Sequence, residues 1–321
     1  SSFQHSGKIN PIEFLKNEII FDTSNHYRHI EPRVSLRYRL DPEKSIKTSF
    51  SQNYQYVHLA STAAVSLPTD LWVPSSKIIK PKFSTQYAIG YFQNIKENMY
   101  ETSIELYYKE MENLIEYREG ILPEDNTNTN SDDAFAFGNG VSYGSEFLIR
   151  KNKGNTTGWI GYTLSKTDRT FNEINNGMTF PAKYDRRHDL SITMTHKLSK
   201  SWDISSVFIY STGNSITLPS ERYVIDGNIY TEYTSRNGFR MIPYHRLDIG
   251  ATYTPKKKKK FTSSWNFSIY NVYNRKNPYF IYLDLESNGD DGSIQQGNVT
   301  PKAYQVSIFP ILPTITWNFN F

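Results

Sequence analysis

The densest cluster of ionisable side chains in the sequence is the hexapeptide Tyr184–Asp189, YDRRHD. A histidine oriented by a carboxylate is a common general base in hydrolases, so Asp185, His188 and Asp189 are candidates for that chemistry. The sequence shows no serine or second acidic pair whose spacing would complete such a site. Ion pairs of Arg187 and Asp189 with neighbouring strands are therefore the preferred interpretation, and a hydrolase built around His188 is an alternative.

Other residues that could do chemistry are sparse. The chain has no cysteine, which excludes thiol catalysis, disulfides and cysteine-ligated metals. The segment DLESNGDDG, residues 284–292, spaces oxygen-bearing side chains as a calcium loop does, but Gln295 stands where the bidentate glutamate would be. The histidines are scattered without ligand spacing. We expect no metal site and no cofactor.

Composition and net charge exclude two classes of protein. Hydrophobic residues make up only 37% of the chain and mean hydropathy is −0.60, and no apolar run approaches the length of a spanning helix. Helical insertion into a membrane is therefore excluded. The net charge is only +4, with both signs interleaved, so we expect no nucleic-acid partner.

Side chains alternate between apolar and polar types with a period of two. In PRVSLRYRL, for example, Leu36 and Tyr38 share one face of an extended chain, whereas Arg33 and Arg37 share the other. The pattern predicts about twelve strands, at residues 32–40, 45–57, 82–93, 98–112, 139–151, 156–167, 187–198, 201–212, 244–254, 261–274, 302–309 and 312–321.

The connections between these strands alternate between short and long. DPEK, NIKEN, KNKGN, LSKS, PKKKKK and PILP are short, and the intervening segments are long and rich in Asn, Asp, Gly, Ser and Thr. An antiparallel up-and-down meander places all short connections at one end. The five consecutive lysines are accordingly expected to form a solvated turn.

A transmembrane β-barrel explains the alternation better than a soluble sandwich does. A barrel turns its apolar residues to lipid and its polar residues to a lumen. Strands of about ten residues match a tilted span, and Tyr38, Tyr210 and Trp265 stand near strand ends as aromatic girdles do. The residues expected to face the lumen or a plug inside it are Arg33, Arg37, Glu146, Arg150, Arg187, Asp189, Arg246 and Asp248.

The long loops carry aromatic side chains that could stack on a ligand. The candidates for ligand binding are Trp72, Tyr223, Tyr230, Tyr233 and Phe239. Packing of the loops on themselves would explain the same residues.

Several segments together resemble the C-terminal barrel portion of TonB-dependent outer-membrane receptors of the Bacteroidota type, which carry a plug and a carboxypeptidase-like regulatory domain. They include SLPTDLWVPS, NGVSYGSEFLIRKN, FPAKYDRRHDLSI, YHRLDIGATY and SSWNFSIYNVYNRKNPYF. The resemblance covers about residues 30–321 and implies an all-β barrel of 22 strands, of which residues 1–321 would supply 12–14 without the plug.

The resemblance also implies a function. Such receptors import a bulky, scarce nutrient, such as a siderophore, vitamin, glycan or peptide, across the outer membrane of a Gram-negative bacterium. The implied partners are outer-membrane lipid, the N-terminal plug and barrel half, TonB–ExbB–ExbD through the N-terminus, a surface lipoprotein, and the barrel-assembly machinery through the C-terminal Phe321. A complete passive porin of 12–14 strands is the alternative within transport.

Overall fold

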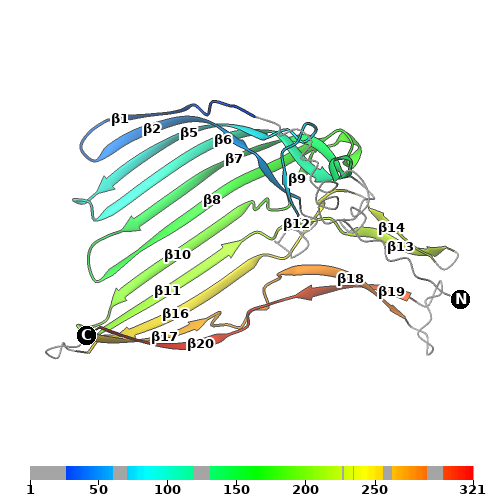
Figure 1. Ribbon diagram of the computed structural model, residues 1–321. Coiled ribbons are helices and arrows are strands. Elements are labelled where there is room, and N and C mark those ends of the chain that lie inside the picture. Colours follow the sequence, from blue (N-terminus) through cyan, green and yellow to red (C-terminus); the bar gives the residue numbers. More distant parts are fainter. Residues whose placement is uncertain are drawn as a thin grey trace, which may run out of the picture.

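The computed structural model describes residues 27–60, 71–118, 131–225, 228–233, 235–255, 262–287 and 299–320. The described part is almost entirely antiparallel β-structure, as the sequence predicts (Figure 1). Two short 3-10 helices, η2 (Ser131–Ala134) and η3 (Asn175–Gly177), are the helical elements of these ranges. Within them no helix is long and apolar enough to cross a membrane.

The strands are β1 Arg33–Arg39, β2 Lys44–Gln55, β3 Val57–Ala60, β4 Leu71–Pro74, β5 Lys82–Ile95, β6 Tyr100–Tyr117, β7 Phe135–Lys151, β8 Thr156–Phe171, β9 Phe180–Pro181, β10 His188–Lys197, β11 Trp202–Ser211, β12 Ser215–Ile216, β13 Pro219–Ile225, β14 Asn228–Tyr233, β15 Phe239–Arg240, β16 Tyr244–Tyr253, β17 Thr262–Tyr270, β18 Phe280–Ser287, β19 Val299–Val306 and β20 Leu312–Asn320.

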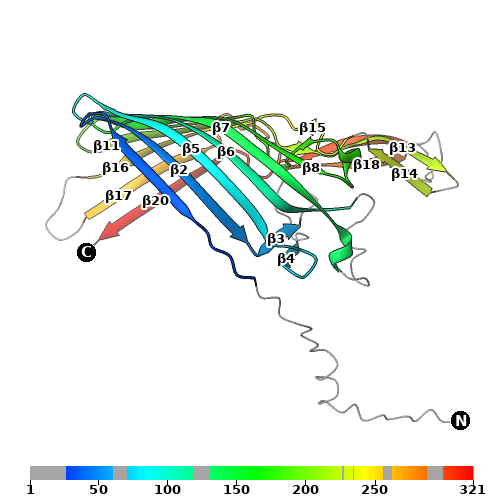
Figure 2. The ribbon, with the colours of Figure 1, turned by 90° about the horizontal axis from the view of Figure 1, so that it is seen from above.

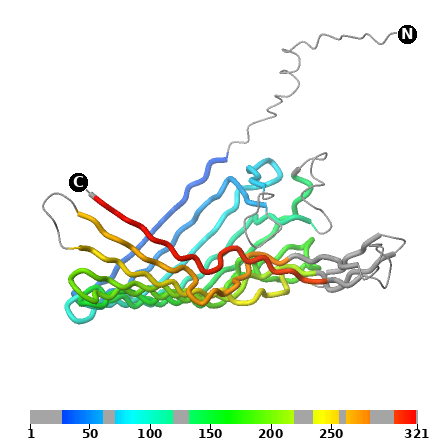
Figure 3. Tube along the Cα trace, turned by 90° about the horizontal axis from the view of Figure 1, so that it is seen from below, coloured from blue at the N-terminus to red at the C-terminus, as the bar shows by residue number. Residues whose placement is uncertain are grey.

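One large antiparallel sheet contains the long strands in the order β1-β2-β5-β6-β7-β8-β10-β11-β16-β17-β20, and β9 pairs with β8. Short connections lie at one end of the sheet and long ones at the other, and β20 ends on the short side (Figure 1). The sheet is curved, so that the strands at its two edges, β1 and β20, come round toward the same side (Figures 2 and 3). In the described residues these two edges are not paired with each other.

The prediction that residues 302–309 form a strand of the main sheet is wrong. Strand β17 pairs directly with β20, and β19 pairs with β18 in a separate two-stranded sheet. The whole segment from Asn271 to Ile311 is thus one long connection, and PILP is not a turn at the short end. Alternation identifies a strand from its own residues, but the partner of that strand depends on register with distant residues.

Strands β6 and β7 continue well beyond their neighbours at the long-loop end, where a bulge interrupts their pairing between Met111 and Leu114. Asn113 at this bulge has a positive φ of 56°, a conformation that Asn tolerates better than most residues. Two hydrophobic clusters cover the two faces of this β6–β7 extension. One contains Ile79, Ile115 and Phe135 with the β3–β4 hairpin, and the other contains Leu114, Phe171, Phe180 and their neighbours.

Candidate functional site

One face of the main sheet is polar. Residues directly opposite each other in antiparallel strands point to the same side. The register therefore defines a row of residues that point to the same side of the sheet. The row begins at Arg37, crosses seven strands and has charged residues at both ends. The row is Arg37, Lys47, Gly90, Glu105, Glu146, Thr163 and Asp189. We call the side of the sheet to which this row belongs the polar face.

The opposite side, the apolar face, carries exposed hydrophobic residues. A row one residue along each strand reads Tyr38, Ile46, Tyr91, Ile104, Phe147, Tyr162, Leu190 and Tyr210. Leu36 and Ile249 on this face leave 68% and 41% of their surface exposed, respectively. Large apolar side chains that are exposed on successive strands indicate that this face contacts a nonaqueous environment.

Aromatic rows bound the apolar face at both ends. At the short-turn end Trp202, Tyr253, Trp265 and Trp317 lie opposite one another across β11, β16, β17 and β20. Toward the long loops, Tyr87, Tyr108 and Tyr143 form a second row. Within β11 alone, the eight steps from Trp202 to Tyr210, which lies near the other end of that strand, measure about 27 Å, or about 20 Å across a bilayer at a tilt of about 40°.

Seven of the eight polar residues predicted from sequence lie on the polar face, and the structure pairs several of them; the eighth, Arg187, precedes β10. Arg246 donates to Asp248 (Nε to Oδ2, 2.9 Å) and to Tyr270 Oη (2.5 Å). Arg150 forms an ion pair with Glu101 at 3.6 Å, and Asp189 lies 3.9 Å from Arg186. The backbone carbonyl of Arg187 accepts a hydrogen bond from Ser165.

At the long-loop end of the polar face, two loops are tied to the sheet by a buried carboxylate, Glu116. Its side chain is 3% exposed and forms ion pairs with Arg169 of β8, with Lys183 at 3.3 Å and with Arg236 at 3.1 Å. Lys183 belongs to the β8–β10 loop and Arg236 to the β11–β16 loop. A single acid therefore joins a strand end to two loops that are far apart in the sequence.

A second buried carboxylate, Asp185, joins the same two loops. Its Oδ1 accepts the backbone N–H of Thr167 at 2.7 Å, and its Oδ2 accepts Arg240 Nη2 at 2.6 Å. Arg240 Nη1 donates to the carbonyls of Asp185 and Gly213. We call the two carboxylates and their cations, Glu116, Arg169, Lys183, Asp185, Arg236 and Arg240, the loop latch.

The electrostatics of the latch favour a charged Glu116. The residue lies beyond the Tyr87–Tyr143 row and therefore outside the apolar span. Burial raises the pKa of the Glu116 carboxyl. The positive charges of Lys183, Arg169 and Arg236 lower this pKa by a larger amount, so it lies below the ordinary value. The pKa of Lys183 is lowered, mainly by burial. The negative charge of Glu116 raises this pKa, but it offsets the effect of burial only in part. The Nε atoms of Arg169 and Arg236 are buried without a hydrogen-bond partner in the described structure.

The hydrolase site expected at YDRRHD is not assembled. His188 lies opposite Leu164 on the apolar face, where its Nδ1 is 2.8 Å from Tyr162 Oη. Asp189, its neighbour in the chain, points to the polar face, and the carboxylate of Asp185 is occupied by the latch. Successive strand residues cannot converge on one substrate. Among the described residues no cluster of His, Asp and Glu could hold a metal ion, and most of DLESNGDDG falls outside them.

The loop aromatics are not brought to one place. Trp72, 63% exposed, belongs to the β3–β4 hairpin, which covers the β6–β7 extension on the side of the apolar face. Phe239 pairs with Ile216 between β15 and β12 and precedes Arg240 of the latch in the chain. Tyr223 and Tyr230 are opposite each other in the β13–β14 hairpin, whose side chains, including that of Tyr233, are outside the described atoms. Phe321 also lies outside the described residues.

Of the loop latch, sequence reasoning named only Asp185 and missed Glu116, Arg169, Lys183, Arg236 and Arg240. Glu116 falls within residues 113–138, which the sequence assigns to a long loop, because the bulge after Met111 breaks the period-two pattern. Arg236 is 120 residues away from it. A signal was present in the alternation of Ile115 and Tyr117 with Glu116 and Arg118 beyond the bulge.

An antiparallel, curved sheet with one polar face and one exposed apolar face bounded by aromatic rows is the wall of a transmembrane β-barrel. The family model described as TonB dependent receptor-like, beta-barrel matches residues 6–274. The chain therefore belongs to the TonB-dependent receptor family, whose barrels lie in the outer membrane of Gram-negative bacteria.

Solved structures show the same fold. The ferripyoverdine receptor of the Pseudomonas aeruginosa outer membrane is 16% identical with a TM-score of 0.55, and covers 90% of this chain and 33% of its own. The ferric-catecholate import receptor Fiu of E. coli K12 is 13% identical, with a TM-score of 0.52 and coverages of 90% and 34%. The FrpB iron transporter of Neisseria meningitidis is 11% identical, with a TM-score of 0.53 and coverages of 90% and 39%. The chain thus spans about a third of the length of these structures. No curated protein sequence matches it.

Proposed function

We propose that this chain forms part of the wall of an outer-membrane active transporter that imports a bulky, scarce nutrient, such as a siderophore, vitamin, glycan or peptide. The observation that carries the proposal is the division of one sheet into an exposed apolar face and a charged face. The apolar face contacts lipid, and the polar face with Arg33, Arg37, Glu146 and Asp248 lines the lumen. The TonB-dependent receptor family of the chain supports coupling to the TonB–ExbB–ExbD proton-motive system.

The wall requires further strands. Strands β1 and β20 span 7 and 9 residues, and about half of the backbone N–H and C=O groups of an unpaired edge point outward. In hydrocarbon each unsatisfied group costs several kcal/mol, which totals tens of kcal/mol for two edges. We therefore propose that strands outside residues 1–321 close the barrel and that a plug domain fills it. The resemblance of the sequence to Bacteroidota-type receptors with a carboxypeptidase-like regulatory domain supports this proposal.

The loop aromatics Trp72 and Phe239, with Tyr223, Tyr230 and Tyr233, are proposed ligand contacts at the extracellular end. The hairpin that carries Trp72 and the β11–β16 loop that carries Phe239 contact opposite sides of the β6–β7 extension, so the two residues would serve different surfaces. Phe239, next to the latch, is the better candidate for a ligand that enters the lumen. Trp72 is better placed to contact the outer leaflet or a surface lipoprotein. Phe321 remains the proposed signal for the barrel-assembly machinery.

Uptake measurements test the proposal. A strain lacking the protein should lose growth on one of a panel of defined iron, vitamin, glycan and peptide sources, and uptake of that source should return with the gene. Dissipating the proton gradient, or deleting tonB, should abolish that uptake. Uptake that continues without TonB would instead identify a passive pore, and peptide or lipid hydrolysis by the purified protein that is lost in His188→Ala would identify an enzyme.

A further inference from the structure

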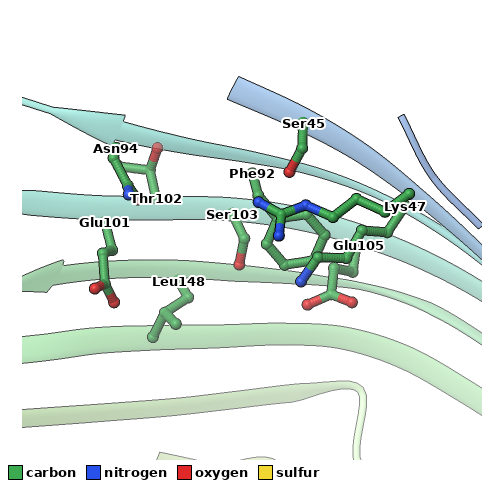
Figure 4. Close-up of a pocket in the computed structure, with 10 residues that line it drawn as sticks. Ser45, Lys47, Phe92, Asn94, Glu101, Thr102, Ser103, Glu105 and Leu148 are labelled. Carbon is green, nitrogen blue, oxygen red and sulfur yellow. The ribbon is translucent and has the colours of Figure 1, made fainter. Parts of the chain in front are cut away.

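A pocket of about 330 Å³ lies on the polar face of β1, β2, β5, β6 and β7 (Figure 4). Arg37 and Lys47 both line it and are directly opposite each other across β1 and β2. Like charges at directly opposed positions of an antiparallel pair destabilise a sheet. A negative charge close to both side chains would therefore stabilise this pair.

The carboxylates of the same wall do not supply that charge. Glu101 lines the pocket but forms its ion pair with Arg150. Glu105 lies two strands from Lys47, with Gly90 between them, and directly opposite Glu146. Among the ion pairs of the described residues none includes Arg37 or Lys47. Both cations thus face the pocket without a negatively charged partner.

The pocket is a half-open hollow, and its lining holds one of the two cations in place. The ammonium group of Lys47 lies 3.9 Å from the ring centroid of Phe92, which holds it over the ring by a cation–π contact. Gly90 keeps the hollow open, because an added Cβ would come within 2.8 Å of both Phe92 Cε2 and Glu105 Cγ. Ser45, Ser103 and Asn94 add neutral polar groups to the lining, and Figure 4 shows these side chains around the cavity.

We propose that this pocket binds a carboxylate-type anionic group between Arg37 and Lys47. A guanidinium and an ammonium on one side of a carboxylate form charge-assisted hydrogen bonds that remove the repulsion between them. The group comes either from a free anion passing along the lumen or from an acidic side chain of a domain that fills it. The inference rests on the proposed function, because only a closed barrel makes the polar face a lumen.

Lysine reactivity tests the site in the intact receptor, purified in detergent from outer membranes. Sulfo-NHS-acetate acetylates accessible amines, and mass spectrometry follows Lys47 and Lys109 separately. Lys109 is a matched control, since it lies on the same face, opposite Gln86 and Ser142, outside the pocket. Citrate is the probe for a free anion. The zero-length carbodiimide EDC, which joins an amine to a carboxylate in contact with it, detects an internal acid.

Two results support the site. Citrate slows acetylation of Lys47 at least about tenfold but not that of Lys109, in which case the anion is free in solution. Alternatively, EDC joins Lys47 to a carboxylate outside the pocket wall, in which case an acidic side chain of the domain that fills the lumen occupies the pocket. Arg37→Gln should weaken the citrate effect, or the yield of cross-link, by at least about tenfold. Gly90→Ala should do the same without changing any charge.

Any other result overturns the proposal, including equal reactivity of Lys47 and Lys109 with and without citrate, or a cross-link from Lys47 only to Glu101 or Glu105. The heat-dependent gel shift of folded barrels verifies that each variant has folded. Uptake that requires TonB can persist when the pocket experiment fails, so the two proposals fail separately. A barrel that folds but shows no uptake on any source refutes the transport proposal while leaving the anion measurement intact.

Discussion

Replacement of Glu116 by glutamine should release the two loops of the latch from the sheet. The substitution keeps the size of the side chain and removes its charge. Arg169, Lys183 and Arg236, whose side chains are 11%, 11% and 18% exposed, then lose their shared anion. Their like charges are left close together in a region of low dielectric.

The expected cost follows from burial. Removing one partner of a buried ion pair destabilises a structure by about 3–5 kcal/mol. The cations retain some contact with water, so the lower end of that range applies. A loss of about 3 kcal/mol raises the population of released loops about 150-fold, because about 1.4 kcal/mol corresponds to a factor of ten. The main sheet should stay folded, because its backbone pairing, in which Glu116 lies opposite Ala136, does not depend on the side chain of Glu116.

Hydrogen exchange and limited proteolysis of the purified receptor measure this release. In Glu116→Gln, amides of residues 172–186 and 235–241 should exchange about 150-fold faster, whereas those of β7, which pairs with β6 and β8, should not change. Glu112→Gln is the matched control, because Glu112 is exposed on the same strand and has no ion pair in the described structure. Equal exchange in both variants would show that Glu116 does not hold the loops.

The latch should also respond to acid. The pKa of Glu116 is lower in the folded protein than in the released state. Its contribution is therefore complete above the ordinary carboxyl pKa and is lost as the pH falls through the folded value. Loop exchange should rise over that acidic range in the native protein, and this rise should be absent from Glu116→Gln.

Three further outcomes are expected. Burial lowers the pKa of His58 in the β3–β4 hairpin, so the docked hairpin should weaken as the pH falls below about 6.5, and His58→Gln should remove this dependence in hydrogen exchange. Ile89→Arg, on the apolar face, should destabilise the folded barrel in urea titrations by about 2–4 kcal/mol, whereas Ala88→Arg, one residue away on the polar face, should be tolerated. Gly158→Ala should disturb the pairing of β8 with β10, because its Cβ would lie 2.1 Å from the carbonyl oxygen of Thr193 at a φ of +154°, and cross-strand hydrogen exchange at Thr193 should report it.

The individual strands of the main sheet were predictable from the sequence. Alternation is a local property: Leu36 and Arg37 point to opposite sides of any extended chain, whatever the partner strand is. The same local rule assigns Ile249 and Asp248 to different faces. Because apolar residues occupy one face on nearly every strand, the sequence also determines that this face needs a nonaqueous neighbour, and hence the barrel class.

Only the tertiary structure decided which strands and charges meet. Residues 302–309 alternate like a barrel strand, yet β19 (Val299–Val306) pairs with residues 280–287, and β17 pairs with β20. The contacts of Glu116 with Lys183 and Arg236, and of Asp185 with Arg240, join segments that no local pattern connects. The physical reason is that a period in the chain specifies where a side chain points, whereas ion pairing depends on the folded path that brings distant segments within a few ångströms.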